Sequence, residues 1–189
     1  MFKGYAPSRM AYPSTVKTER LVLHRWDPEA HSPALTNINA QPVAVTYLNA
    51  GVPYTAHESR AQSERFTAHW DRYGFGLWAV EVAGEVVGFA GAAHPMWFPA
   101  YLAEVELGWR FDPRAWGNGY ATEAARAAAE AAFTHLELDR LIACIDPENT
   151  PSLAVAERLG MTLDVTVEHP QRPGPLAIYE LSASAPDRD

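Results

Sequence analysis

Residues 104–124 read E-V-E-L-G-W-R-F-D-P-R-A-W-G-N-G-Y-A-T-E-A, and they give the clearest indication of the chain's architecture. The run 103–111 alternates polar and apolar residues, which predicts a β-strand. A turn at 112–113 follows, and the alanine-rich run 117–136 places its apolar residues at helical spacing. The stretch therefore predicts a strand, a glycine-bearing turn and a helix in direct succession.

The turn between this strand and helix is suited to bind an anion. Gly117 and Gly119 tolerate unusual φ values and let a ligand approach the backbone. The N–H groups and dipole of a helix N-terminus attract phosphate. Neither the G-x-G-x-x-G pattern nor the G-K-[ST] pattern is present, since position 122 is Thr. The glycines alone favour an ordinary turn, so the phosphate-binding interpretation needs support from another motif.

The flanking sequence predicts an α/β fold. Thr55 and Glu58 form a capping box that begins a helix ending near Tyr73, and another helix begins after Asp27, disturbed by Pro33. A further helix begins at Pro151 and ends at Gly160. Strands are predicted at 19–26, 77–82, 85–92, 103–111, 140–145, 161–168 and 175–181. Hairpins come before the β–α–β unit, which predicts a mixed central sheet of about six to seven strands with helices on both faces.

Length and composition predict one domain over residues 1–189, with a core at about 16–181 and flexible ends at 1–14 and 182–189. Cys144 is the only cysteine, which excludes an internal disulfide. No run approaches the roughly 18 apolar residues of a membrane span. The first residues also lack the apolar core of a secretion signal. We therefore expect a cytoplasmic protein without a membrane partner.

Charge and histidine spacing narrow the function classes further. The chain carries 15 Lys and Arg against 23 Asp and Glu, a net charge of −8, without a basic cluster. Binding to nucleic acid needs such a cluster, so it is not expected. The acidic surplus favours cationic substrates weakly, but it also serves solubility. The seven histidines show no metal-ligand spacing, and no metal is expected.

Three ordered motifs resemble those of the GCN5-related N-acetyltransferase (GNAT) superfamily. R-A-W-G-N-G at 114–119 is similar to its [QR]-x-x-G-x-[GA] signature, and W-G-N-G-Y-A-T-E-A at 116–124 resembles the ribosomal-protein N-acetyltransferase-like (RimJ/RimL-type) branch. T-E-R-L at 18–21 resembles that branch's opening strand. N-x-x-S at 149–152, followed by E-R-L-G-M at 157–161, resembles its later block. The resemblance implies the GNAT fold, whose central sheet is mixed and splayed.

The resemblance also implies acetyl-CoA as cosubstrate and an amine as acetyl acceptor. The strands at 103–111 and 140–145 would splay, and the pantetheine arm would pair with the backbone of the first. Ligands lie in such crevices beyond the carboxyl ends of strands. The residues implied to bind acetyl-CoA are Trp109, Arg110 and Phe111 at the pantetheine, Arg114, Ala115, Trp116, Gly117, Asn118 and Gly119 at the pyrophosphate, and Tyr120, Thr122, Asn149 and Ser152 nearby.

Glu106 is the first candidate for general base. An alkyl amine with a pKa of about 10 is mostly protonated near neutrality, and a carboxylate can take its proton directly or through water. In the family the A-E-[IL]-G-[YW] strand carries a glutamate, which matches Glu106 here. Glu104 has the same strand parity and is the alternative. Both could instead be solvated residues, or could hold a cationic substrate without taking its proton.

Ser152 is the candidate general acid for the departing thiolate. Many relatives carry a tyrosine acid in the following helix, but that position here is Ala156. Ser152 can equally serve the first turn of a helix, and the CoA thiolate can leave without a side-chain acid.

The acceptor is left open by the sequence. A protein N-terminal amine and a small-molecule amine (an antibiotic, a polyamine or an amino acid) are both consistent with the motifs. A CoA-binding module without catalysis and a role in assembly are the alternatives from other classes. Trp97, Phe98 and Tyr101, or the loop 48–54, are candidate acceptor walls, although packing explains at least two of these aromatic residues better. The family often forms homodimers, which makes a second copy of the chain an expected partner.

Overall fold

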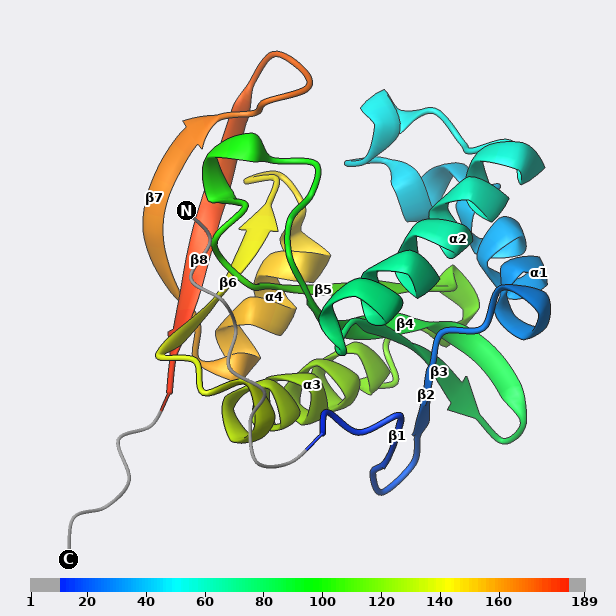
Figure 1. Ribbon diagram of the computed structural model, residues 1–189. Coiled ribbons are helices and arrows are strands. Elements are labelled where there is room, and N and C mark those ends of the chain that lie inside the picture. The colour runs from blue at the N-terminus through cyan, green and yellow to red at the C-terminus, as the bar shows by residue number, and fades with distance from the viewer. Residues whose placement is uncertain (1–10, 184–189) are drawn as a thin grey trace, which may run out of the picture.

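The computed structural model describes residues 11–183 of the protein (Figure 1). One eight-stranded sheet is flanked by four α-helices. The strands are β1 (Thr15–Lys17), β2 (Val22–Arg25), β3 (Leu77–Val82), β4 (Glu85–Ala93), β5 (Glu106–Phe111), β6 (Arg140–Ile145), β7 (Thr162–Glu168) and β8 (Pro175–Ser182). The helices are α1 (Pro28–Asn39), α2 (Ala56–Tyr73), α3 (Tyr120–Leu136) and α4 (Thr150–Leu159), with short 3-10 turns at 42–45, 49–51, 99–101 and 113–115.

The sheet is mixed and splayed, as predicted. Its strand order is β1-β2-β3-β4-β5-β6-β8-β7, and all neighbours are antiparallel except β5 and β6. These two parallel strands pair at a single position, Glu106 with Ile142. Beyond that position they diverge, which opens the sheet toward their carboxyl ends.

Helices cover both faces of the sheet. The side chain of Arg110 on β5 reaches Asn39 of α1 and Gln62 of α2. The neighbouring Trp109 packs with the cluster that contains Ala156 of α4. Successive strand residues point to opposite faces, so α1 and α2 cover one face and α4 covers the other. On the α1–α2 face, residues 94–105 cover the sheet beyond α2, because Phe98 packs with Ile142 and residues of β8.

Local signals account for most of the helix ends. The Thr55 hydroxyl accepts from the Glu58 N–H (3.2 Å), and the Glu58 carboxylate accepts from the Thr55 N–H (2.7 Å), so the predicted capping box is present. In α3 the residues toward the sheet are small and buried, which lets the helix lie close to β4 and β5. Pro33 lies inside α1 without ending it.

The structure departs from the predictions at three boundaries. The chain turns at Thr18, whose N–H donates to the Leu21 carbonyl (3.0 Å), so the predicted first strand is preceded by β1 and the sheet gains an eighth strand. The strand predicted at 103–111 begins at Glu106, after a turn closed by the Glu104 N–H. The helix predicted from about Gly117 begins at Tyr120, because Gly119 has a left-handed φ of 80°.

The predicted flexible ends lie largely outside the described residues. Within the described part, Tyr12 stacks on Trp78 with ring centroids 4.8 Å apart. None of the helices in residues 11–183 is long and apolar enough to cross a membrane.

Candidate active site

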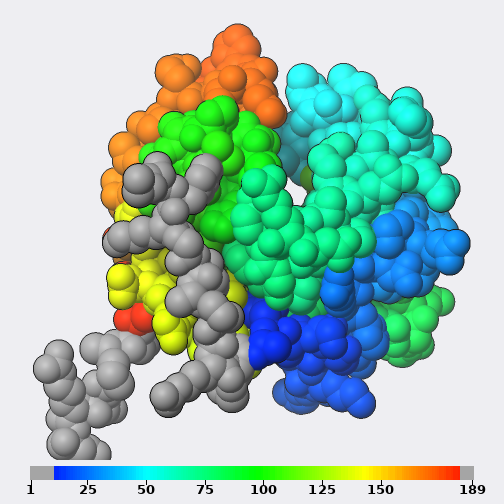
Figure 2. All heavy atoms as spheres, viewed as in Figure 1, coloured from blue at the N-terminus to red at the C-terminus, as the bar shows by residue number. Residues whose placement is uncertain are grey.

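A cleft of about 2380 Å³ crosses the α1–α2 face of the sheet. Its floor is β5, and its walls come from α2 and residues 43–50 on one side and from residues of the 94–105 segment and the β7–β8 turn on the other. Figure 2 shows the surface hollowed between these two walls. The cleft continues past the gap between β5 and β6 and runs along α3 and α4, including their first turns. It thus joins the splayed strands to the glycine-bearing loop.

The loop before α3 presents a row of free backbone donors. Gly117 and Gly119 have φ values of 78° and 80°, and α3 has no side-chain cap. Within residues 11–183, the N–H groups of 117–122 donate to no protein acceptor. Such a row at a helix N-terminus is suited to hold a diphosphate.

The free donors begin later than the sequence predicts. The Arg114 N–H donates to Asp112 Oδ1 (2.9 Å), the Ala115 N–H to the Asp112 carbonyl (2.8 Å), and the Trp116 N–H to the Pro113 carbonyl (3.2 Å). These three amides stabilise the turn itself. The donor set therefore shifts from 114–119 to 117–122 and takes in the amides of Tyr120 and Thr122.

Side chains hold this turn in place. The Arg114 guanidinium donates to both carboxylate oxygens of Asp112, a buried residue, and its hydrogen bond lowers the pKa of that carboxyl. Trp116 Nε1 donates to the Phe111 carbonyl (2.9 Å), and Asn118 Nδ2 donates to the Ala115 carbonyl (3.1 Å). The side chains of Arg114, Trp116 and Asn118 are thus engaged in protein contacts.

Two motifs that are distant in sequence meet at Glu123. Its carboxylate accepts from the Thr18 hydroxyl (2.6 Å), from the Arg20 N–H (3.0 Å) and from Arg20 Nε (2.7 Å). Arg20 Nη1 also donates to the Asn118 carbonyl (2.8 Å), and its guanidinium lies over the Tyr120 ring. The T-E-R-L segment therefore fixes the glycine-bearing loop. The sequence motifs contain both partners, but their spacing does not reveal the contact.

Replacing Glu123 with glutamine is expected to lower the free energy of unfolding by about 1–2 kcal/mol, because charge-assisted hydrogen bonds to Thr18 and Arg20 are weakened. Chemical denaturation measures this loss. The matched control is Glu130→Gln, an exposed position on the same helix outside the ion pairs of the described residues. Equal losses in the two variants would contradict a specific role for the Glu123 contacts.

Glu106 lies on the floor of the cleft. Its Oε2 accepts from Trp97 Nε1 (3.0 Å), and the Cys144 thiol is a second neighbour. Burial raises the pKa of Glu106, while the hydrogen bonds from Trp97 and Cys144 oppose that rise. In its ionised form such a carboxylate can accept a proton from an amine. Cys144 packs against the core cluster around Phe98 and also lines the cleft, and burial raises the pKa of its thiol.

Glu104, the alternative base, lies away from the cleft. It precedes β5 and accepts from Arg140 Nη2 at 2.9 Å. Of the two candidate bases, Glu106 lines the cleft and Glu104 does not.

Asn149 and Ser152 line the cleft at the start of α4. Asn149 is the N-cap, and its Oδ1 accepts from the Ser152 N–H (3.2 Å). This places the Ser152 hydroxyl on the first turn of the helix, beside the gap between β5 and β6. Ala156, the position where many relatives carry a tyrosine, is fully buried.

The aromatic residues at 97–101 divide between site and core. Trp97 contacts Glu106 and lines the cleft, whereas Phe98 is buried and Tyr101 packs against it (ring centroids 4.5 Å apart). Leu48 and Tyr54, from the other predicted wall, also line the cleft. Among residues 11–183 no group of three or more His, Cys, Asp or Glu side chains could hold a metal ion.

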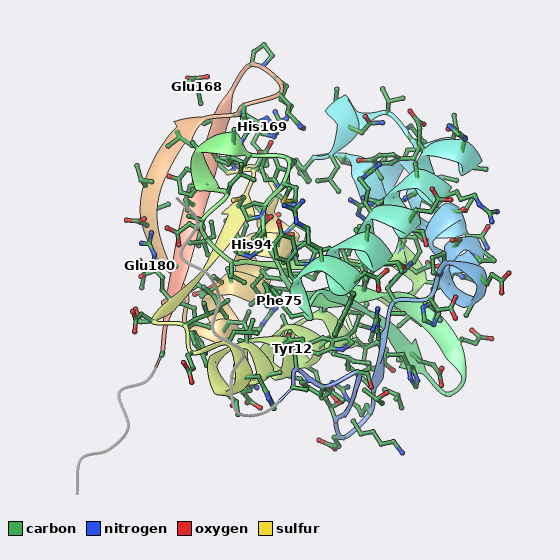
Figure 3. All side chains as sticks on the ribbon, viewed as in Figure 1. Tyr12, Phe75, His94, Glu168, His169 and Glu180 are labelled. Carbon is green, nitrogen blue, oxygen red and sulfur yellow. The ribbon has the colours of Figure 1, made fainter. Side chains whose placement is uncertain are left out.

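Two histidines join the walls of the cleft. His69 of α2 contacts the Phe75 carbonyl through Nδ1 (2.9 Å), and its Nε2 accepts from the His94 N–H (2.9 Å). Figure 3 shows His94 beside Phe75, where the 94–105 segment meets the end of α2. The contacts require a neutral His69, and burial lowers its pKa to about 4.

Because of His69, the free energy of unfolding is expected to decrease as the pH is lowered from about 6.5 to about 4. In this window the unfolded chain binds a proton at His69 that the folded chain does not, so acid favours unfolding by up to about 3 kcal/mol. Denaturation of the wild type and of His69→Gln at several pH values measures the difference. The variant should lose less stability across the window; parallel curves would contradict this role.

The fold and the cleft place a row of free backbone amides at a helix N-terminus, and comparison with known proteins identifies the family. The model of the acetyltransferase (GNAT) domain matches residues 20–162, and the chain belongs to this family. The predicted RimJ/RimL-like membership is thereby confirmed.

Individual relatives agree with the family assignment. An acetyltransferase structure from Agrobacterium tumefaciens (strain C58) is 34% identical, with a TM-score of 0.76, over 95% of this chain and 100% of that one. YkkB of Bacillus subtilis (strain 168), described as an uncharacterised protein, is 37% identical over 57% of this chain and 62% of its own length, so the chain spans less than two thirds of that relative. RimL, a ribosomal L7/L12 alpha-N-protein acetyltransferase in complex with coenzyme A, has a TM-score of 0.72 at 18% identity over 92% of this chain and 98% of that one, which shows the shared fold alone.

Proposed function

We propose that the protein transfers the acetyl group of acetyl-CoA to a primary amine by direct transfer in a ternary complex. One observation carries the proposal: a single cleft joins the free amides of 117–122, the gap between β5 and β6, and the carboxylate of Glu106. The amides would hold the pyrophosphate, and the gap would take the pantetheine arm along residues 109–111. GNAT enzymes use acetyl-CoA, and RimL, which shares the fold, binds coenzyme A.

Glu106 supplies the base in this mechanism. It takes a proton from the ammonium form of the acceptor, directly or through water, and the neutral amine then attacks the thioester carbonyl. A backbone N–H at the splayed edge of β5 polarises the carbonyl oxygen as negative charge develops. A C–N bond forms, the C–S bond breaks and the nitrogen releases its second proton to solvent, so the products are an N-acetylated amine and the CoA thiolate.

The thiolate receives its proton from Ser152 or from solvent. Ser152 lies beside the gap at the start of α4, and Ala156 brings no acidic group. A thiol pKa of about 8.5 makes the thiolate a fair leaving group, so the general acid contributes less than the base.

Release of free CoA thiol from acetyl-CoA tests the proposal. A panel of amines should include peptides with a free N-terminus, polyamines, amino acids and amine-bearing antibiotics, because the motifs are consistent with each. Amine-dependent thiol release at a rate above the uncatalysed reaction supports an acetyltransferase. The amines of the panel that are acetylated then show whether the acceptor is a protein N-terminus or a small molecule. Tight acetyl-CoA binding without release for any amine would favour a CoA-binding module. A homodimer stays a prediction.

A further inference from the structure

The cleft contains a positive charge that the acetyl-transfer mechanism does not use. Arg110 lies on the cleft side of β5, and its guanidinium is held between the rings of Phe89 (5.3 Å) and Tyr54 (5.6 Å). Its Nη1 donates to Asn39 Oδ1 and to Gln62 Oε1 (3.3 Å). Its Nε is buried and has no hydrogen-bond partner in the described part of the chain.

No carboxylate neutralises this guanidinium within residues 11–183. Arg110 takes part in none of the ion pairs there, although the chain has 23 acidic residues. The hydrogen-bonding partners of Arg110 are the amides of Asn39 and Gln62 and the hydroxyl of Tyr54, and none of them is a carboxylate. Asn39 Nδ2 donates to Ser59 Oγ (3.1 Å) and Gln62 Oε1 (2.9 Å), so its own oxygen is directed to Arg110. These dipoles solvate the cation but leave its charge uncompensated.

The Arg110 guanidinium is partly desolvated and has no carboxylate beside it, so it favours the binding of an anion that accepts hydrogen bonds from its N–H groups. Burial lowers the pKa of Arg110, and an arginine remains protonated despite such a shift. A charge in this environment interacts more strongly than in bulk water. The planar guanidinium matches a carboxylate better than it matches a single hydroxyl or carbonyl.

The position of Arg110 relates it to the proposed base. Arg110 and Glu106 are four residues apart on β5, so they face the same side, and their Cα atoms are about 13 Å apart along the strand. Glu106 attracts an ammonium group, and Arg110 attracts an anion. A molecule that touches both carries its two charges several bonds apart.

We propose that the acceptor is an amino acid-like molecule whose carboxylate binds Arg110 while its amine, several bonds away, faces Glu106. This inference rests on the proposed function and specifies its substrate class. Side-chain amines of amino acids and N-terminal amines of very short peptides fit the description. Simple α-amino acids are too short, and polyamines lack the anion.

Matched acids and amides test this recognition. The substrates are ω-amino acids from glycine to 8-aminooctanoate, each compared with its primary amide, so that only the carboxylate changes. For chains of several methylenes we expect kcat/KM for the acid to exceed that for the amide by at least about tenfold, as one charge-assisted contact provides. Glycine should show less preference. Equal values for acid and amide at every length overturn the proposal.

Two variants assign the preference to the guanidinium. Arg110→Met removes the charge, and Gln62→Glu keeps the shape of its residue while placing a carboxylate on Arg110. Both should bring the ratio of acid to amide toward one. A ratio that stays at the wild-type value in both variants overturns the assignment. Gln62→Glu covers the case in which Arg110→Met fails to fold.

A binding measurement separates this proposal from the proposed function. The acids and amides are titrated calorimetrically into the wild-type protein, with and without CoA. Acids that bind at least about tenfold more tightly than their amides support the Arg110 site even if no amine is acetylated. Equal or absent binding of both overturns it. Failure of acetyl-CoA to bind contradicts the proposed function alone.

Discussion

Replacement of Glu106 with glutamine is expected to lower kcat by about 100-fold to 10,000-fold, the usual contribution of a general base. Glutamine keeps the size of the side chain and can still accept from Trp97, but it cannot take a proton from the amine. The affinity for acetyl-CoA should change little, because the free amides that would hold the pyrophosphate lie on a different element. Steady-state kinetics with an accepted amine, together with calorimetric titration of acetyl-CoA, measure both effects.

The pH profile supplies the control for this assignment. Glu106 must be ionised to act, so kcat/KM should fall as pH drops through its pKa, which burial raises above the ordinary 4.5. Trp97→Phe removes a hydrogen bond that favours the charged carboxylate, and it should move this acidic limb to higher pH. Unchanged turnover in Glu106→Gln, or a profile that Trp97→Phe does not move, would contradict Glu106 as base.

Aspartate at Gly117 or Gly119 is expected to weaken acetyl-CoA binding by at least about 100-fold. An aspartate here adds a negative charge next to the amides that would hold the pyrophosphate, and positive φ costs an L-residue about 1–2 kcal/mol. At Gly117 a new Cβ would meet no protein atom within 4 Å, so the loss would come from charge and φ and not from a clash with the chain. Calorimetric titration of acetyl-CoA measures it.

Gly84→Asp is the matched control for these variants. Gly84 also has a positive φ of 86° with open space around it, but it lies in the β3–β4 turn outside the cleft. It should lose stability without losing acetyl-CoA affinity. If all three variants bind acetyl-CoA equally well, the pyrophosphate does not bind at 117–122.

Predicted and observed site residues differ where distant contacts matter. The alternation at 103–111 correctly predicted a strand that carries Glu106. The same alternation extended it to Glu104, but a turn and the ion pair with Arg140 remove that residue from the strand and from the cleft. The family resemblance implied a pyrophosphate site on the amides of 114–119, yet the bonds that Asp112 and Pro113 accept decide which amides of this loop stay free.

The sequence by itself determined the α/β class, the order of most elements, the alanine-rich buried face of α3 and the family. These features depend on periodicity, helix caps and motifs, each of which spans only a few neighbouring residues. The tertiary structure alone decided the Glu123 contacts, which join residues 103 and 105 positions apart, and the environments of Glu106 and Arg110. Burial, hydrogen bonding and charge compensation depend on side chains brought together by the sheet and its helices. These properties set the pKa of Glu106 and leave Arg110 without a counter-ion in the described chain, and no local pattern records them.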